Sequence, residues 1–381
     1  MAVFCQRPID RRDIWEDDMQ RRSFLGGLAT GSVAASATAL ATPAIAQNTQ
    51  TWRMVTAWPK NFPGQGVGAQ RLADRITQAS GGRLTIQVFS AGELVPPLQS
   101  LDAVIDGNAE MSHGASYYWQ NKSAGLSLFS GVPYGMTSRE LSAWIRHMGG
   151  QQLWDDIYDQ FGVQGFLAGD TGTQAGGWFR NELTSVADIQ GLRFRTPGLG
   201  GRVWQQLGAS VTNMAAGEIF QALQSGTLDA AEFVGPYNDL ALGFHQIAKN
   251  YYFPSFIEPA LTAELAIDKS KYLALPEDLQ AIIRLAAQAE HDEIASDFAA
   301  NDPRALETLV NDHGVQVRQF PEDILEAGAK AAAEAINSLR DGDELTARAV
   351  EGFIAALAIV RRKTELAETP FVRARQQYFK L

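Results

Sequence analysis

The spacing of hydrophobic residues changes several times after residue 47, and each change predicts a new secondary-structure element. Alternating apolar positions predict strands, whereas apolar positions three or four residues apart predict helices. The first predicted elements are a strand at 51–58, a helix at 64–82 closed by Gly81 and Gly82, a strand at 83–92, a helix after Pro97 and a strand with a loop at 111–119. This βαβαβ order favours a parallel sheet covered by helices.

A second and shorter α/β unit is predicted further along the chain. Its expected elements are a helical segment at 137–162 weakened at Gly149 and Gly150, strands at 163–172, 191–195, 210–214 and 228–236, and helices at 201–208 and 217–226. The chain then returns in extended form over 250–268. A long helix is expected after Pro276, with Asp302 and Pro303 marking a restart, because an N-cap residue followed by proline is typical of a helix start. The remainder is helical, and Pro370 is expected to break it.

The amino-terminal residues have the composition of an export signal. Paired Arg21 and Arg22 precede a weakly apolar run that ends in Ala44-Ile45-Ala46. A charged region, an apolar region and an A-x-A site predict a signal peptide over residues 1–46, and the twin arginine indicates the twin-arginine route to the periplasm. The first eighteen residues precede Met19, so either Met1 or Met19 is the start. A membrane helix is the weaker reading, because the run is rich in Ala, Gly, Ser and Thr.

The net charge, the cysteine content and the missing catalytic motifs exclude several classes of function. The formal net charge is −11, which argues against nucleic acid as a partner. The single cysteine, Cys5, lies in the predicted signal, so the exported chain would have no thiol, in keeping with an oxidising periplasm. The five histidines are scattered without metal-ligand spacing, and no G-x-S-x-G, Walker or G-x-G-x-x-G motif follows a strand. The sequence therefore predicts that the protein is not an enzyme.

Residues 191–201, "GLRFRTPGLGG", contain the most informative charges. Alternation in a strand would place Arg193 and Arg195 on one face, opposite Leu192 and Phe194, and Pro197 would end the strand. Alternation alone cannot separate a solvated strand face from an arginine that binds an anion. An aromatic cluster that includes Tyr117 and Tyr118 follows another strand, where it can be core or line a ligand cleft.

The segment from Asp188 to Asp239 resembles the central signature of the DctP-type solute-binding proteins of tripartite ATP-independent periplasmic (TRAP) transporters. The matching positions are Gly191 to Arg195, Leu207-Gly208-Ala209, Glu218, Ala222-Leu223-Gln224, Gly226, Asp229 and Glu232, and "FSAGEL" at 89–94 fits the amino-terminal half of the family. Ala215 and Phe220 depart from the usual Pro and Tyr. The "VGPYND" that follows Phe233 resembles the branch that binds 2-oxo monocarboxylates such as pyruvate, with lactate binders close by.

The resemblance implies an α/β, two-domain periplasmic-binding-protein-like fold with hinge strands, a long domain-spanning helix and a C-terminal helix. It implies that Arg195 binds the substrate carboxylate, through the two parallel donors of a guanidinium, and that a cation bridges protein and substrate. Sodium is expected in preference to calcium, and both prefer oxygen ligands. The implied cation ligands are Gln174, Glu232, the carbonyl of Phe233 and Glu258, and the implied substrate contacts are Arg195, Gln174, Asn213, Tyr117 and Tyr118.

Other interpretations of these residues stay open. Glu232 can form an interdomain salt bridge, Gln174 can make a plain loop hydrogen bond, and Asn213 can be a cap. Glu218 fits a first-turn acid favoured by the helix dipole better than a ligand. A periplasmic enzyme acting on organic acids and a sensor-only binding module are the alternative functions, and lactate or another 2-hydroxy acid is the alternative substrate.

The domain boundaries and the partners follow from the same resemblance. Domain I is expected over 47–171 and 259–300, domain II over 172–258 and 301–343, and a C-terminal helix over 344–381. That helix can pack on its own chain or support a homodimer. The expected partners are a small monocarboxylate and membrane permease subunits.

Overall fold

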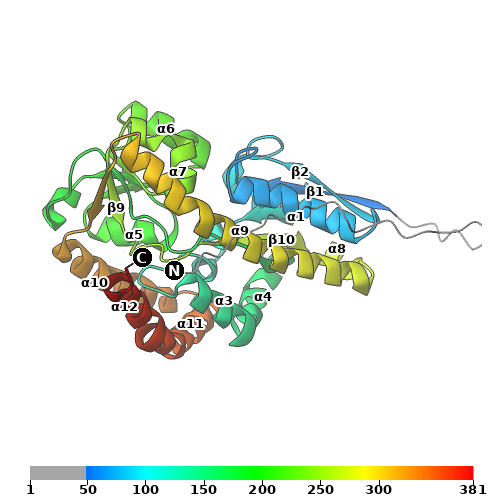
Figure 1. The fold of residues 1–381 in the computed structure, drawn as a ribbon. Coiled ribbons are helices and arrows are strands. Elements are labelled where there is room, and N and C mark those ends of the chain that lie inside the picture. Colours follow the sequence, from blue (N-terminus) through cyan, green and yellow to red (C-terminus); the bar gives the residue numbers. More distant parts are fainter. Residues whose placement is uncertain (1–48, 381) are drawn as a thin grey trace, which may run out of the picture. The chain divides into compact units, whose positions relative to one another are not determined.

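Two mixed sheets organise residues 49–380, which are the residues that this computed structural model describes (Figure 1). The first sheet has the order β2 (Leu84–Phe89), β1 (Gln50–Thr56), β3 (Met111–Gly114), β10 (Thr262–Asp268) and β4 (Val163–Asp170). The second has the order β11 (Gln316–Gln319), β9 (Asn250–Phe253), β5 (Gly177–Phe179), β8 (Ala230–Ala231), β6 (Arg193–Arg195) and β7 (Ser210–Thr212). The exact domain boundaries expected from the sequence stay a prediction.

Helices and short turns of helix connect these strands. The α-helices are α1 (Gln65–Ala79), α2 (Ser100–Ile105), α3 (Ser138–His147), α4 (Gly150–Asp159), α5 (Gly198–Gln206), α6 (Ala216–Gln224), α7 (Pro236–Leu242), α8 (Lys269–Ala274), α9 (Glu277–Asn311), α10 (Glu322–Ser338), α11 (Glu344–Lys363) and α12 (Thr369–Tyr378). The 3-10 turns are η1 (Pro97–Gln99), η2 (Ser116–Trp119), η3 (Ala124–Phe129), η4 (Val186–Ile189), η5 (Phe244–Gln246) and η6 (Leu339–Asp341), and η7 (Thr364–Glu368) is a π-helical turn.

The predicted export signal, with Arg21, Arg22 and the cleavage site at Ala46, lies outside the described residues. All of the described residues belong to one compact unit. None of the helices within residues 49–380 combines the length and the apolar character that a membrane crossing requires.

The expectation of a parallel sheet is only partly correct. Strand β1 pairs in parallel with β2 and β3, as the βαβαβ order predicts, but β10 runs antiparallel to both β3 and β4. Strand β10 enters the first sheet directly from the second, through residues 254–261, and no crossover helix returns the chain to the starting edge. Parallel pairing requires such a crossover, so the returning strand pairs antiparallel.

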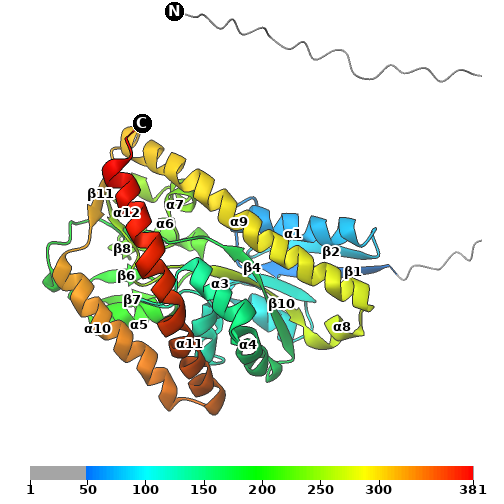
Figure 2. The ribbon, with the colours of Figure 1, turned by 60° about the horizontal axis from the view of Figure 1, so that its bottom comes forward.

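Helix α9 passes along elements of both sheets, as Figure 2 shows. It packs on α1 and β4 in its first half and on α7 in its second half. The predicted restart at Asp302 and Pro303 is wrong, because the helix continues through Pro303 to Asn311. Oδ1 of Asp302 accepts a hydrogen bond of 2.9 Å from the backbone N–H of Tyr237. Asp302 therefore caps the first turn of α7 rather than its own helix.

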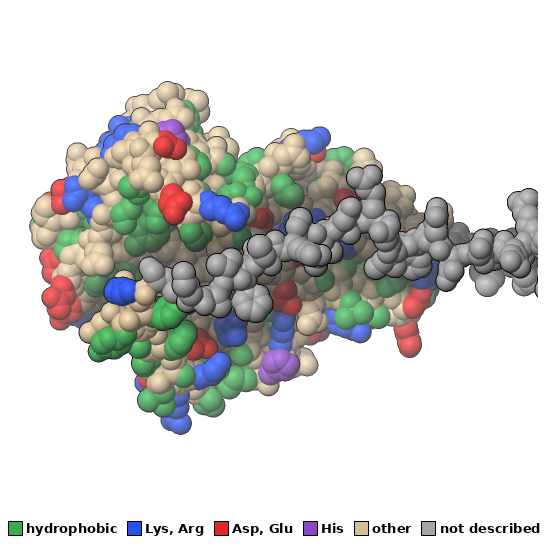
Figure 3. Space-filling view, in the orientation of Figure 1, with side chains coloured by type: hydrophobic (Ala, Val, Ile, Leu, Met, Phe, Trp, Pro, Cys, Tyr) green, Lys and Arg blue, Asp and Glu red, His purple; other side chains and the backbone are tan. Residues whose placement is uncertain are grey.

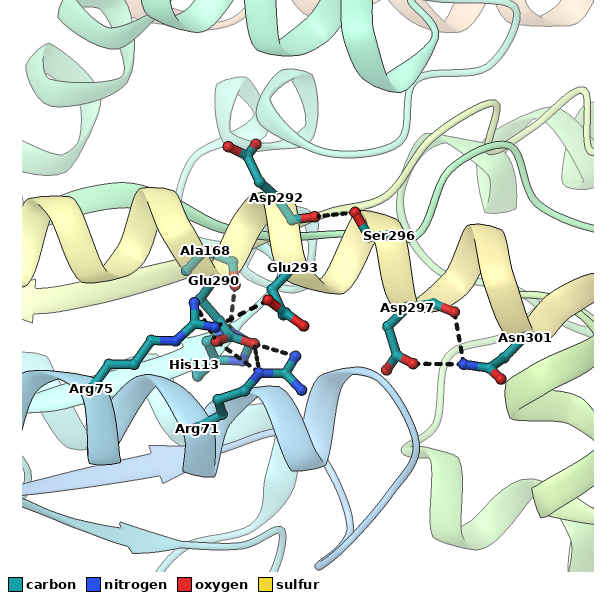
Figure 4. Close-up of polar contacts among 10 residues, drawn as sticks. All are labelled: Arg71, Arg75, His113, Ala168, Glu290, Asp292, Glu293, Ser296, Asp297 and Asn301. Atoms are coloured by element: carbon teal, nitrogen blue, oxygen red, sulfur yellow. Dashed lines mark hydrogen bonds and ion pairs between the residues drawn. The ribbon is translucent and has the colours of Figure 1, made fainter. Parts of the chain in front are cut away.

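A buried ion cluster fastens the first half of α9 to α1 (Figure 4). The side chain of Glu290 is fully buried and receives Arg71 at 2.6 Å and Arg75 at 3.3 Å, both from α1. Gly68 of α1 permits this approach, since a Cβ there would lie 3.0 Å from Oε1 of Glu290. Because a buried carboxylate is costly unless it is paired, this cluster fixes the position of α9 against the first sheet.

The chain ends in a helical run that proline does not break. Helix α11 continues through the π-helical turn into α12, and Figure 2 shows the run in red. Pro370 was expected to break the helix, and that expectation is wrong. It stands in the first turn of α12, directly after the π-helical turn, and the helical run continues through it. Several large apolar side chains of this run are exposed, among them Leu366 and Phe371, and Figure 3 shows apolar side chains on this side of the surface.

Candidate binding site

The carboxyl ends of five strands, drawn from both sheets, bring the candidate site residues together. Tyr117 and Tyr118 follow β3, Gln174 follows β4, Arg195 ends β6, Glu232 follows β8 and Glu258 follows β9. Ligands of open α/β sheets bind in the crevice at these ends. Of these side chains only that of Tyr118 is partly exposed, and the others are buried.

The two arginines of β6 have different environments. Arg193 is half exposed and forms an ion pair with Asp229. Arg195 is 1% exposed; its Nη1 donates to the backbone carbonyl of Glu232 at 2.5 Å and its Nε donates to that of Met214 at 3.2 Å. Two backbone carbonyls therefore orient the Arg195 guanidinium without neutralising its charge.

Two carboxylates and one carboxamide meet beside Arg195. The amide of Gln174 lies 3.1 Å from Oε1 of Glu232 and 3.1 Å from Oε2 of Glu258. With its nitrogen toward the carboxylates, the amide donates to both and its oxygen accepts from Thr171. With its oxygen toward them, three oxygens converge on one point, and the nitrogen donates to Thr171 at 2.9 Å.

This oxygen set fits a hard cation. Sodium and calcium bind oxygen ligands, and Oε1 of Glu258 is a buried oxygen without a hydrogen-bond partner in the described chain. Within residues 49–380, no group of three or more His, Cys, Asp or Glu side chains is placed to hold a metal ion. The candidate site itself offers only two carboxylates, those of Glu232 and Glu258, and one amide. A cation here would depend on the amide of Gln174, a backbone carbonyl or a ligand oxygen.

Burial shifts the acid–base behaviour of the cluster. Loss of hydration raises the pKa of Glu232, although the charge of Arg195 opposes the shift. The pKa of Glu258 is raised well above its ordinary value, first by burial and then by repulsion from Glu232. Burial also raises the pKa of Tyr117, and raises that of Tyr118 to about 12. Both phenols are therefore hydrogen-bond donors at neutral pH.

Aromatic side chains enclose the charged cluster. The ring of Phe233 lies 5.2 Å from the guanidinium carbon of Arg195, in a cation–π arrangement. Tyr117 and Tyr118 pack edge to face at 4.8 Å. These rings exclude water, which strengthens electrostatic interactions within the cluster.

Two contacts join the segment after β1 to the segment after β8. Phe62 packs edge to face on Phe233 at 5.8 Å, and Nδ2 of Asn238 donates to the carbonyl of Pro63 at 2.9 Å. One segment belongs to the first sheet's side of the site and the other to the second sheet's side. These contacts therefore hold the two sides together over Arg195.

The described structure thus brings together Arg195, Gln174, Glu232, Glu258 and the two tyrosines, while Asn213 is exposed outside this cluster. Phe233 approaches through its ring, and a cation-binding role for its carbonyl stays a prediction. Sequence reasoning missed Thr196, whose Oγ1 donates to Oε2 of Glu232 at 3.2 Å. Its signal was its position, because it is a polar residue directly after the strand that carries Arg195.

Comparison with known proteins agrees with this geometry. Residues 54–341 match DctP, the bacterial extracellular solute-binding protein family 7. The chain belongs to the DctP family. The resemblance seen in the sequence is therefore confirmed, together with the α/β solute-binding fold. DctP proteins are extracytoplasmic receptors rather than enzymes.

Three relatives illustrate the family. The monocarboxylate 2-oxoacid-binding periplasmic protein of Nostoc sp. is 39% identical over 308 residues, which cover 77% of this chain and 84% of the relative. A TRAP solute-binding protein of Bordetella bronchiseptica has a TM-score of 0.84 at 32% identity, and the match covers 86% of this chain and 97% of the Bordetella chain. Its structure is a mixed-occupancy dimer with calcium and picolinate bound. The TRAP protein of Pseudoalteromonas atlantica, with sodium and pyruvate, has a TM-score of 0.83 at 35% identity and covers 86% and 99%.

Proposed function

We propose that this DctP protein is the periplasmic solute-binding receptor of a TRAP transporter, that it binds a small 2-oxo monocarboxylate such as pyruvate, and that it delivers this ligand to membrane permease subunits. The observation that carries the proposal is the buried Arg195 beside Glu232, Glu258 and Gln174. Related proteins bind pyruvate or carry a 2-oxoacid-binding name, which supports this substrate class.

In this proposal the substrate carboxylate binds the Arg195 guanidinium, which two backbone carbonyls already orient. An oriented guanidinium loses little freedom when it binds, so more of the hydrogen-bond energy appears as affinity. Tyr117 and Tyr118 donate to the ligand oxygens. The rings of Phe233 and Tyr117 exclude water from the pair.

The proposed cation is held by Gln174, Glu232 and Glu258, with the 2-oxo acid contributing oxygens. A bound cation would supply the positive charge that this site needs. With both carboxylates ionised and an anionic substrate bound, three negative charges would face the single positive charge of Arg195, so the site would be negative overall without a cation. Sodium is the cation expected from the sequence. Relatives hold sodium or calcium, so both are tested in parallel.

The test is calorimetric titration with pyruvate, in sodium-containing, calcium-containing and cation-depleted buffer. Arg195→Gln should weaken binding on the order of a hundredfold, because it removes the charge-assisted hydrogen bonds. Arg193→Gln is the matched control, since that side chain is two residues away and pairs with Asp229 at the surface. Equal affinity of the Arg195→Gln variant and the wild type would refute the site assignment.

The alternatives give different readouts. A periplasmic enzyme would convert the acid, so product would appear on incubation with lactate or a 2-oxo acid. A sensor-only module would bind pyruvate in the same way, but its ligand-bound form would dock on a membrane sensor protein instead of a permease. Transport by membrane vesicles that contain the permease separates these two.

We also propose that the helical run of α11 and α12 pairs with a second copy of the chain. Leu366 is 82% exposed and Phe371 is 63% exposed, which is unusual for side chains of this size. One relative is a dimer. Light scattering should give a dimer mass, and a double substitution of Leu366 and Phe371 by glutamate should give a monomer. A wild-type monomer at micromolar concentration would exclude the pairing.

A further inference from the structure

A pocket of about 300 Å³ adjoins the candidate site through Thr196. It lies between the turn η2 on one side and β6, α5 and β7 on the other. Its polar lining residues are Gln120, Thr196, Arg202, Gln205 and Asn213. The pocket therefore includes Asn213, a residue that the buried cluster leaves out.

The pocket shares its walls with the buried cluster. Thr196 lines the pocket, follows Arg195 directly in the chain, and donates to Glu232 within the cluster. Gly198 lines it too, with a positive φ of 59°, and a Cβ at this position would lie 3.3 Å from Cγ of Tyr117. A ligand that extends past Thr196 and Gly198 would leave the cluster and enter this pocket.

The pocket lining is rich in hydrogen-bond donors and suits a negatively charged group of a ligand. Arg202 is half buried and has no ion-pair partner within the described chain, and no Asp or Glu is among the described residues that line the pocket. Three carboxamides surround it, and Oε1 of Gln120 is buried without a hydrogen-bond partner there. In a chain with a net charge of −11, an arginine without a nearby acid is a distinct positive feature. Guanidinium forms strong, often bidentate hydrogen bonds with carboxylates and phosphates, and a carboxylate is the group that the tail of a longer organic acid would carry.

From this lining we infer that the protein also takes 2-oxo acids whose tail ends in a carboxylate, with Arg202 as the residue that binds the second carboxylate. The inference rests on the proposed function, because Arg195 must hold the first carboxylate. Pyruvate has no second carboxylate, so it has no group for Arg202 to bind and would use the buried cluster alone. The pocket therefore sets the preference among longer acids.

The experiment compares two acids of equal chain length, 2-oxopentanedioate and 2-oxopentanoate, with pyruvate as the reference ligand. Calorimetry gives three dissociation constants for the wild type, Arg202→Gln, Asn213→Ala and the control Gln206→Ala, an exposed neighbour of Gln205 that does not line the pocket. Each variant's thermal midpoint is measured as well. Because Arg202 is partly exposed, Arg202→Gln should fold normally.

The wild type should bind the dicarboxylate about tenfold more tightly than the chain-matched monocarboxylate, as expected for one charge-assisted contact. Arg202→Gln should abolish this ratio and leave the pyruvate affinity unchanged, Asn213→Ala should reduce the ratio, and Gln206→Ala should leave it unchanged. If Arg202→Gln weakens all three acids equally, or if pyruvate binds and the ratio is absent, the inference is wrong while the proposed function stands. If none of the three acids binds the wild type, both fail.

Discussion

Glu264 provides a quantitative test of how burial controls stability in the first sheet. It lies on β10 and is 1% exposed, and its carboxylate accepts from Nε1 of Trp119 at 2.6 Å and from the Tyr158 hydroxyl at 2.7 and 2.8 Å. Burial raises its pKa from the ordinary 4.5 to about 7, although these two donors oppose the shift. The folded protein therefore holds a proton at Glu264 that the unfolded chain has already lost.

The raised pKa fixes the sign of the pH dependence. The contribution of Glu264 to stability is fully present below about pH 4.5 and is lost as the pH rises through 7, because the unfolded state ionises first. Each pKa unit corresponds to about 1.4 kcal/mol, so the loss approaches about 3 kcal/mol above pH 8. The Glu264→Gln variant carries an uncharged amide of nearly the same shape, and it should not show this loss.

Urea unfolding of the wild type and the Glu264→Gln variant between pH 5 and pH 8.5 measures the difference in their free energies of unfolding. The contributions of the other titrating groups cancel in this difference, because both proteins share them. The Glu264→Gln variant should be more stable than the wild type by about 1 kcal/mol at pH 5 and by about 3 kcal/mol at pH 8.5. Glu326→Gln, at an exposed site on α10, is the control and should show no trend. A difference between wild type and Glu264→Gln that does not change with pH would refute the reasoning.

Three further substitutions test the packing around the site. Glu290→Ala leaves two arginines without their buried partner and should lower the free energy of unfolding by about 3 kcal/mol in urea titration, and Glu290→Gln should cost less because its amide oxygen still accepts; a loss below about 0.5 kcal/mol for the alanine variant would contradict this. Gly131→Ala would place a methyl group 2.8 Å from the backbone carbonyl oxygen of Ala260 and 3.0 Å from Cγ of Glu258. Pyruvate affinity should therefore fall about tenfold, and the free energy of unfolding should fall as well. Gly217→Ala, where a Cβ meets nothing within 4 Å, should leave both affinity and stability nearly unchanged. Asn238→Ala removes a hydrogen bond that joins the two sides of the site and should weaken pyruvate binding about fivefold by calorimetry, and an unchanged affinity would show that this contact does not contribute to closure.

Local periodicity was enough to predict most strands and helices. The helix expected at 64–82 corresponds to α1, and the strands expected at 51–58 and 83–92 correspond to β1 and β2. Two of the failures, the restart at Asp302 and the direction of β10, depend on a distant part of the chain. Asp302 has the sequence of a helix start, yet it caps α7, which lies 65 residues away along the chain.

The roles of the candidate site residues came from the family resemblance, and the pattern of the sequence alone placed Arg195 only at the end of a strand. Alternation placed Arg193 and Arg195 on one face and could not distinguish them. Their difference arises from tertiary contacts: Asp229 lies beside Arg193 at the surface, while Phe233 and the carbonyl of Met214 cover Arg195. The pocket around Arg202 has no local signature, since Gln120 from a distant segment closes a wall formed by residues 196–213.

The contacts of Arg195 also bear on whether Glu232 is its salt-bridge partner or a ligand-binding acid. The closest approach of the two charges, Nη1 to Oε2, is 3.7 Å, which is too long for a hydrogen bond. The shorter contact of Nη1 is to the backbone carbonyl of Glu232, and Oε2 of Glu232 instead accepts from Thr196. A dedicated salt bridge would use the carboxylate oxygens at about 2.8 Å. The guanidinium is therefore positioned by the backbone and keeps its charge for another anion, and the Glu232 carboxylate remains available to a cation.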